Sequence, residues 1–369
     1  MSETRIKQLA SEGDGLLIIE GAMGLFDGAP PYGRGATADL ARILGLPVVL
    51  VVDAARMSQS VAPLVAGFAA HDPKVHIAGV ILNRVGSERH AAMLRAALAP
   101  VGVPVLGAMR RDSALALPDR HLGLVQAQEH PALDAFLDRA ADAVDDCVDL
   151  DALCALASDL PAPVPSGSGW RAPLANSELN PPAHSIAIAY DQAFAFAYPH
   201  LWNSWSRGGA RLTFFSPLAD DPVPEAEFIF LPGGYPELHA ESLAANATFL
   251  HSLRAASHSA QIYGECGGYM VLGETLTDAE GRVHHMAGLL DLRTSFAERR
   301  LHLGYRRLTA GTGPLKGKWN GHEFHYATTL RAEGTPLFEA EDAEGTRLPP
   351  MGLIKGNVSG SFAHIIDAA

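Results

Sequence analysis

IYGECGGYMVLG, residues 262–273, is the stretch that decides the fold of the second half of the chain. It reads as a short apolar strand, a tight glycine turn and the start of a helix, with Cys266 at the bend. Gly264, Gly267 and Gly268 allow the strained elbow that exposes a nucleophile. A buried structural cysteine in a glycine-rich turn is the alternative, and the three flanking glycines favour the nucleophile.

A nucleophilic cysteine needs a base, and the C-terminal segment GSFAHIID (residues 360–367) offers one in His364. One histidine on an apolar strand is more often structural, but the pair Cys266 and His364 is a stronger signal than either residue alone. A second glycine loop, PGGYPE, follows the apolar run FIFL. Backbone N–H groups of Gly233 and Gly234 in this loop could stabilise an oxyanion, whereas an ordinary βα turn is the alternative.

The first half of the chain alternates apolar runs with helix-like segments, which predicts a doubly wound α/β sheet of parallel strands. The predicted strands are residues 16–20, 48–52, 77–82 and 103–107, and the predicted helices are 36–44 and 60–70. Glu20, Asp53 and Asn83 stand at the ends of three of these strands, where such sheets bind ligands.

Strand signals resume in the second half after a segment rich in Pro, Gly and Ser. The predicted strands are residues 186–190, 212–215, 228–231 and 262–263. The proposed division is an N-terminal domain at 1–160, a linker at 161–184 and a second α/β domain at 185–369.

Length and composition narrow the class of protein. With 369 residues the chain is long enough for about two domains. Its 28 Lys and Arg against 41 Asp and Glu give a net charge of −13, which argues against a nucleic-acid or anionic-membrane surface. The apolar run at residues 46–52 is far shorter than a membrane span. Three cysteines and a polar start predict a cytoplasmic protein without a disulfide scaffold.

The loop EGAMGLFDG, residues 20–28, carries two carboxylates around glycines at a strand end. Mg²⁺ prefers carboxylate oxygens together with phosphates and water, so Glu20 and Asp27 are candidate ligands beside a nucleotide. Asn83 is a candidate contact to the nucleotide base. A glycine-rich βα turn without a metal, and a plain strand-end asparagine, are the alternatives.

The segments LPGGYPEL (231–238), GECGGYMVLG (264–273) and GSFAHIID (360–367) resemble class I, triad-type glutamine amidotransferases of the cobyric acid synthase group. The resemblance implies that Cys266 attacks the glutamine side-chain amide and releases ammonia, with His364 as base and Gly234 in the oxyanion loop. Many relatives carry Glu two residues after the histidine. Here that residue is Ile366, and Asp367 should point to the other strand face, so the residue that orients His364 is not identified.

The rest of the chain resembles the ATP-dependent amidoligases that are similar to dethiobiotin synthetase, with a P-loop NTPase-type sheet. The resembling segments are residues 20–28, 45–68, 77–90 and 117–125, while 286–306 and 321–327 favour the a,c-diamide synthase branch over cobyric acid synthase. The resemblance implies that ATP with Mg²⁺ phosphorylates a corrin carboxylate and that ammonia from glutamine then displaces the phosphate. The substrate would be cobyrinate or hydrogenobyrinate, and the C-terminal segment at residues 357–367 favours hydrogenobyrinate. A homodimer is a possible assembly.

Two histidines of the segment GHEFHYA, His322 and His325, are candidates to line the substrate cleft or the domain interface. A metal site is the alternative, but HEFH lacks a third His or Cys at usual spacing, so no zinc is expected.

A phosphate-binding G-x-x-x-x-G-K-[ST] loop does not occur in this sequence, and the start, residues 2–12, is helix-like. The family places its P-loop on the first strand, so the chain as written is expected to lack a first βα unit and to expose apolar surface. Three explanations would account for the missing P-loop: the start codon is misassigned, the chain is a truncated paralogue, or another chain supplies the segment. The alternative functions are a glutaminase that supplies ammonia to a partner, an inactive scaffold, and a cobyric acid synthase.

Overall fold

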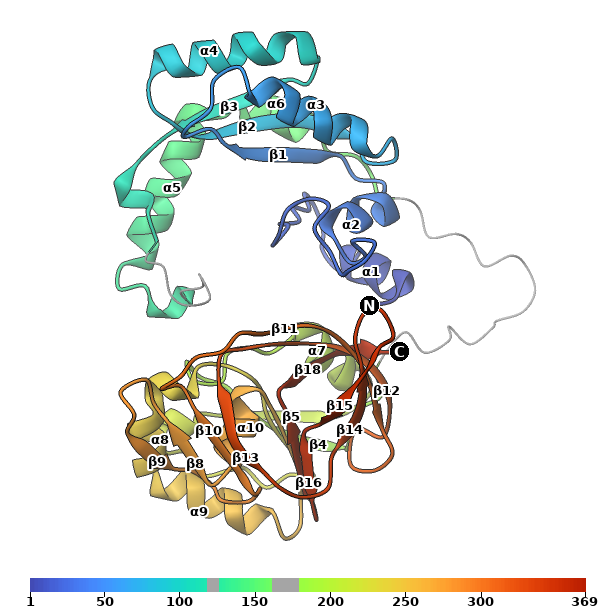
Figure 1. Cartoon of the computed structure of the whole chain (residues 1–369), viewed down its shortest axis with the longest axis vertical. Helices are drawn as coiled ribbons and strands as arrows, with labels where there is room; N and C mark the ends of the chain where they lie inside the picture. Colours follow the sequence, from blue (N-terminus) through green and yellow to red (C-terminus); the bar gives the residue numbers. More distant parts are fainter. Residues whose placement is uncertain (118–125, 161–178) are drawn as a thin grey trace, which may run out of the picture. The chain divides into compact units, whose positions relative to one another are not determined.

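The structure is a computed structural model that describes residues 1–117, 126–160 and 179–369 (Figure 1). Most of the predicted linker at 161–184, and nearly all of the motif at 117–125, lie outside the described residues. The chain divides into two compact units. The N-terminal unit comprises residues 6–28 and 32–167, and the C-terminal unit comprises residues 1–5, 29–31 and 168–369.

A three-stranded parallel sheet in the order β1-β2-β3 forms the centre of the N-terminal unit. The strands are β1 (Val48–Asp53), β2 (Ile77–Val85) and β3 (Val105–Arg110). The helices of this part of the chain are α1 (Glu3–Ala10), α2 (Thr37–Leu44), α3 (Val61–His71), α4 (Glu88–Leu98), α5 (Leu133–Cys147) and α6 (Leu150–Ala155), with short 3-10 turns η1 (Ala99–Val101), η2 (Ser113–Leu115) and η3 (Ala127–Glu129).

Helices α3 and α4 bury their apolar sides against the sheet, as the alternation of apolar runs and helical segments predicts. Val65 from α3, Leu94 from α4 and Leu82 from β2 are fully buried in one cluster. The Ser87 side chain accepts a hydrogen bond from the His90 amide (3.2 Å) and so caps the start of α4. The predicted parallel α/β sheet and its two predicted helices are confirmed.

Two details of the prediction are wrong. Residues 16–20 form no strand, and Ile18 is 80% exposed. An apolar run becomes a strand only where its backbone pairs with a neighbour, and among the described residues none pairs with this segment. Strand β3 begins two residues later than predicted because Pro104 has no N–H for a ladder. Strand β1 is an edge of the described sheet, and its Val51 is 64% exposed.

Three sheets make up the C-terminal unit. Their strands are β4 (Ser185–Ala189), β5 (Arg211–Phe215), β6 (Phe228–Leu231), β7 (Gln261–Glu265), β8 (Thr275–Thr277), β9 (Val283–His285), β10 (Leu292–Ser295), β11 (His302–Ala310), β12 (Gly317–His325), β13 (Thr328–Ala332), β14 (Phe338–Glu341), β15 (Arg347–Met351), β16 (Leu353–Lys355), β17 (Val358–Ser361) and β18 (Ala363–Ala368). The helices are α7 (Pro199–Arg207), α8 (Ala240–Ala245), α9 (Ala247–Ala256) and α10 (Gly267–Leu272), with 3-10 turns η4 (Pro217–Ala219) and η5 (Pro236–His239).

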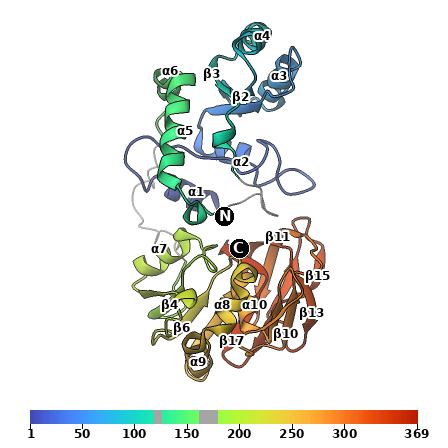
Figure 2. The same cartoon turned by 90° about the vertical axis from the view of Figure 1, so that its left-hand side faces the viewer.

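The central sheet of this unit has the order β16-β17-β7-β6-β4-β5, and β17, β7, β6, β4 and β5 run parallel. The other two sheets have the orders β15-β14-β11-β12-β18 and β13-β10-β8-β9. Helix α10 contacts β6, β7 and β17 of the central sheet and β8 and β10 of the four-stranded sheet, and Figure 2 shows it between β6 and β10. The chain leaves the central sheet at the end of β17 and enters the five-stranded sheet as β18, with Phe362 between them.

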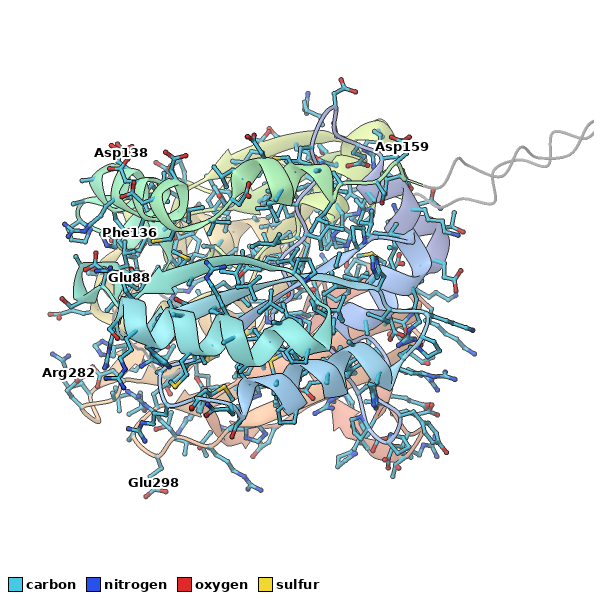
Figure 3. All side chains as sticks on the ribbon, turned by 90° about the horizontal axis from the view of Figure 1, so that it is seen from above. Glu88, Phe136, Asp138, Asp159, Arg282 and Glu298 are labelled. Carbon is cyan, nitrogen blue, oxygen red and sulfur yellow. The ribbon has the colours of Figure 1, made fainter. Side chains whose placement is uncertain are left out.

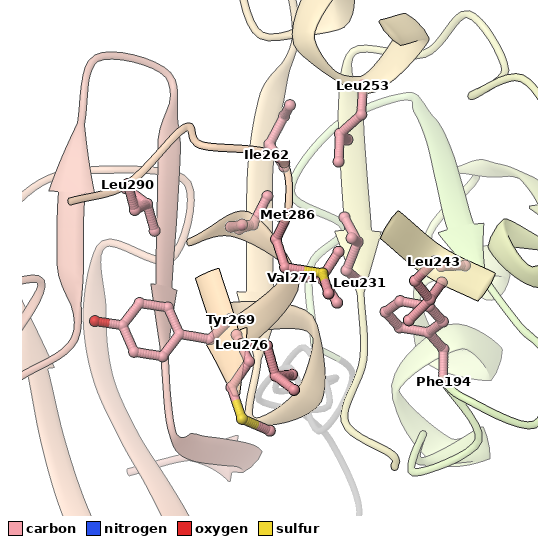
Figure 4. Packing of buried hydrophobic residues seen from close by; sticks show 14 of the residues in the cluster. Phe194, Leu231, Leu243, Leu253, Ile262, Tyr269, Val271, Leu276, Met286 and Leu290 are labelled. Atoms are coloured by element: carbon pink, nitrogen blue, oxygen red, sulfur yellow. The ribbon is translucent and has the colours of Figure 1, made fainter. Parts of the chain in front are cut away.

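The main core of the C-terminal unit lies around α10. Ile262 from β7, Leu253 from α9 and Val271 from α10 are fully buried within it (Figure 4). Charged side chains such as those of Asp138 and Arg282 point outward from the ribbon (Figure 3). Among the described residues, no helix combines the length and the apolar character needed to cross a membrane.

We expect Leu253→Ala to lower the free energy of unfolding of the C-terminal unit by about 2–5 kcal/mol, because it removes a fully buried side chain and leaves a cavity. Leu330→Ala is the matched control, since Leu330 is 61% exposed on β13 and should change stability by less than about 0.5 kcal/mol. Urea titration followed by tryptophan fluorescence measures both. Equal losses in the two variants would contradict the described core.

Candidate active site

Cys266 lies at a strained bend between β7 and α10. Its backbone has φ 46° and ψ −102°, a positive-φ conformation that costs a non-glycine residue about 1–3 kcal/mol. The Cys266 amide donates to the carbonyl oxygen of Ser361 on β17 (2.8 Å), which fixes the bend to the neighbouring strand. A Cβ atom at Gly268 would lie 2.0 Å from the Leu231 carbonyl oxygen, so this position requires glycine. The sequence thus folds into the predicted elbow.

His364 comes from a different sheet and meets Cys266 above Gly233. A Cβ atom placed on Gly233 would lie 2.4 Å from Cε1 and 3.1 Å from Nε2 of His364, and 3.2 Å from the Cβ of Cys266. Only glycine therefore lets the imidazole edge and the cysteine approach each other. His364 is 2% and Cys266 4% exposed. The structure brings these three predicted residues together in one buried site.

The glycine loop after β6 packs closely on both of its sides. The Gly233 carbonyl accepts a hydrogen bond from the Phe196 amide (2.9 Å). A Cβ atom on Gly234 would lie 2.0 Å from the Ala193 carbonyl oxygen, and one on Gly267 would lie 3.0 Å from the Gly234 nitrogen. The Gly234 amide therefore sits next to the residue that follows the nucleophile. This is the position from which an oxyanion donor would act, and the donor role of Gly233 and Gly234 stays a prediction.

Burial sets the protonation of the two reacting groups. Desolvation, with smaller contributions from nearby His322 and His325, lowers the pKa of His364 to about 3. Desolvation also raises the pKa of the Cys266 thiol, with a smaller contribution from Glu237. At neutral pH the pair is therefore a thiol and a neutral imidazole, so that His364 keeps a lone pair for a proton.

His322 lies directly beside His364. The two residues pair in register across β12 and β18, and their rings stack with centroids 4.9 Å apart at an interplanar angle of 2°. The Tyr198 hydroxyl lies 2.6 Å from His322 Nε2. Burial lowers the pKa of His322, so this neighbour is also neutral. His322 contacts the base itself, and its predicted substrate role stays untested.

His325 belongs to a cluster on β11 and β12 with three further side chains. Its Nε2 lies 2.9 Å from Oε1 of Glu323, while Oε2 of Glu323 accepts two hydrogen bonds from Arg306 (2.8 and 3.0 Å). The ring of His302 stacks on that of His325 at 4.6 Å. His302, Glu323 and His325 are close enough to share a metal ion, but Arg306 already supplies a cation to the carboxylate. The geometry therefore favours an ion-paired cluster over a metal site.

Sequence reasoning missed Glu265, the residue just before the nucleophile. Its side chain is 1% exposed, and Oε1 accepts a hydrogen bond from the Ile365 amide (2.9 Å) on β18. Its Oε2 lies 3.8 Å from His364 Nδ1. Asp367, in contrast, accepts from the Ser2 amide (3.1 Å), which agrees with the expectation that it points away from the histidine. The available signal was an acid at the end of a buried apolar strand.

In the N-terminal unit the ends of β1 and β2 carry the predicted polar residues. Asp53 and Asn83 are paired in register, and Arg84 donates from Nη1 to Oδ2 of Asp53 (2.8 Å). The Ala55 amide and Arg84 lower the pKa of the Asp53 carboxyl. Arg84 has φ 58°, a left-handed conformation that turns the chain sharply after Asn83. These side chains gather at the carboxyl ends of parallel strands, where α/β sheets bind ligands.

The predicted metal ligands Glu20 and Asp27 are both exposed. Asp27 lies in a tight loop, since its amide donates to the Gly24 carbonyl (3.0 Å) and a Cβ on Gly24 would lie 2.1 Å from its Oδ2. No contact among the described residues joins Glu20 or Asp27 to Asp53 or Asn83. Their carboxylates have the donor chemistry that suits Mg²⁺, and their role stays a prediction.

Both halves of the chain match known protein families. Residues 185–369 match the family model of the CobB/CobQ-like glutamine amidotransferase domain, and residues 4–125 match the CobQ/CobB/MinD/ParA nucleotide binding domain. The chain is 54% identical to a hydrogenobyrinate a,c-diamide synthase of Brucella abortus over 98% of its length and 82% of that protein. It is 49% identical to the synthase of the same name from Rhodobacter capsulatus, over 99% of its length and 84% of that protein.

These matches extend over nearly the whole chain and include the segments that hold Cys266, His364 and the glycine loop. The chain therefore belongs to the family of hydrogenobyrinate a,c-diamide synthases, glutamine amidotransferases with a CobB/CobQ-like domain.

Proposed function

We propose that this chain carries out the glutamine- and ATP-dependent amidation of the a and c carboxylates of hydrogenobyrinate in cobalamin biosynthesis. The named relatives supply the substrate, and the observation that carries the proposal is the Cys266 elbow closed by His364 above Gly233. We infer a cytoplasmic location for this reaction, and a homodimer stays a prediction.

The glutaminase half begins with proton transfer from the Cys266 thiol to Nε2 of His364. The thiolate sulfur attacks the side-chain amide carbon of glutamine, and the carbonyl oxygen gains the negative charge that the glycine loop stabilises. The C–N bond then breaks as the imidazolium returns its proton to the leaving nitrogen, which releases ammonia and leaves a thioester. Water, deprotonated by His364, cleaves the thioester to glutamate and restores the thiol.

The synthetase half belongs to the N-terminal unit. A corrin carboxylate oxygen attacks the γ-phosphorus of ATP, ADP leaves, and ammonia displaces phosphate from the acyl phosphate to give the amide. Glu20 and Asp27 would hold Mg²⁺, which neutralises phosphate charge when bound, and Asn83 would contact the base. The match to a nucleotide binding domain and the polar strand ends at Asp53 and Asn83 support this placement.

We expect Cys266→Ala to abolish glutamine hydrolysis, with a fall in kcat of at least about 10³-fold, because no other group replaces the thiolate. Release of glutamate measures the effect. Cys147→Ala and Cys154→Ala are matched controls in the N-terminal part of the chain and should keep the full rate.

The same Cys266→Ala variant should still amidate hydrogenobyrinate when ammonia is supplied, as seen by mass spectrometry. Hydrolysis that survives Cys266→Ala would remove the cysteine from its proposed role. Wild-type hydrolysis of glutamine without amidation by either nitrogen source would instead favour a glutaminase that serves a partner.

We expect Glu20→Gln and Asp27→Asn to lower Mg²⁺-dependent ATP turnover about tenfold or more while glutamine hydrolysis is unchanged, since each removes one carboxylate ligand. Asp14→Asn is the control, because Asp14 is an exposed acid in the same part of the chain. The assay measures ADP release over a Mg²⁺ titration. An unchanged Mg²⁺ dependence would exclude these carboxylates as ligands.

A further inference from the structure

Two buried polar atoms face each other behind the nucleophile. Oε2 of Glu265 and Nδ1 of His364 are 3.8 Å apart, and neither has a hydrogen-bond partner among the described residues. The two residues are 1% and 2% exposed, so water does not satisfy these atoms from bulk solvent. A buried polar atom without a partner costs about 1–3 kcal/mol, which a short movement that joins the two atoms would remove.

The Glu265 carboxyl is held in place by its other oxygen. Oε1 accepts the Ile365 amide (2.9 Å), and Glu265 pairs in register with Ser361 on β17. Burial raises the pKa of Glu265, and the resulting value of about 8 already includes the opposite effect of the Ile365 amide and the Tyr263 hydroxyl, which favour the carboxylate. A hydrogen bond from His364 Nδ1–H would favour the carboxylate further.

Two further acids, Glu323 and Asp367, are engaged elsewhere. Glu323 binds Arg306 and His325 through its two oxygens. Asp367 contacts Ser2 and Arg5. The residue two after His364 is Ile366, which has no acidic side chain, and its carbonyl lies 2.7 Å from His200 Nε2.

We propose that Glu265 is the positioning residue of His364: it accepts a hydrogen bond from Nδ1–H, keeps Nε2 free for the Cys266 proton, and stabilises the imidazolium that forms. This inference rests on the proposed roles of Cys266 and His364. The acid that orients the base thus comes from the residue adjacent to the nucleophile, on β7, and not from the strand that carries the histidine.

Glu265→Gln separates this role from a structural one. Glutamine keeps the side-chain shape and an oxygen that accepts the Ile365 amide, but places an NH₂ group where Oε2 was. That group donates to Nδ1 and forces the imidazole proton onto Nε2, which removes the base. We expect kcat for glutamine hydrolysis to fall about 10²–10⁴-fold, with KM for glutamine and the urea midpoint nearly unchanged.

Asp278→Asn is the matched control. Asp278 is another buried carboxylate in the C-terminal unit, and its Oδ2 lies 2.9 Å from Nε2 of His284, away from the Cys266 site. We expect this variant to lose stability and to keep the wild-type kcat. A comparable fall in kcat for Asp278→Asn would show that loss of any buried His–carboxylate pair lowers the rate of glutamine hydrolysis. That result would overturn the specific role of Glu265.

The tautomer of His364 gives a second readout that does not depend on the folding of the variant. Nitrogen-15 NMR of wild-type protein with labelled histidine, recorded above pH 8, should place the His364 proton on Nδ1. A proton on Nε2 of the wild-type residue, or full kcat in Glu265→Gln, would overturn the proposal. If Cys266→Ala still hydrolyses glutamine, the proposed function itself is wrong. If Cys266→Ala is inactive but Glu265→Gln keeps full activity, only the positioning role of Glu265 is wrong.

Discussion

The hydrogen bond from the Cys266 amide to the Ser361 carbonyl is the constraint on which the active site depends. It joins the end of β7 to the end of β17 at the point where the chain leaves the central sheet. Three residues later His364 is already in another sheet, and the bond from the Ile365 amide to Glu265 ties that sheet back to β7. Nucleophile and base therefore come from two sheets, which are joined here by a hydrogen bond from a backbone amide of one sheet to the Glu265 side chain of the other.

This arrangement explains why a fully buried pair can still react. Desolvation keeps the resting thiol and imidazole uncharged, so neither reacting group is a buried ion before the proton moves. Charge appears only when the proton moves, and the Glu265 carboxyl then lies 3.8 Å from Nδ1 of the imidazolium, so that a short movement closes the pair. In the proposed mechanism the glycine loop and Glu265 act on charge that develops in the transition state and is absent from the ground state.

Local sequence patterns predicted much of this structure, and pairing between distant segments accounts for the errors. Cys266, Gly233 and His364 lie in short motifs whose glycines indicate that neighbouring backbone and side chains pack closely there. These residues could therefore be identified from the sequence alone. Residues 16–20 look like a strand by composition, but strand formation depends on a partner edge that no local pattern encodes. Glu265 was missed for a related reason: its relation to His364 exists only because β18 crosses the end of β7.

The bend at Cys266 explains how Glu265 and Cys266, which are adjacent in the chain, can both face His364. Along a strand, successive side chains point to opposite faces, so an acid next to a nucleophile would normally face away from the shared base. The bend at Cys266 removes that restriction, because its positive φ ends the strand alternation at the nucleophile itself. Glu265 can then keep the strand direction and reach Nδ1 from one side of the imidazole, while Cys266 turns toward the Nε2 edge above Gly233. The strained elbow therefore exposes the thiol and also allows two consecutive residues to act on opposite nitrogens of one histidine.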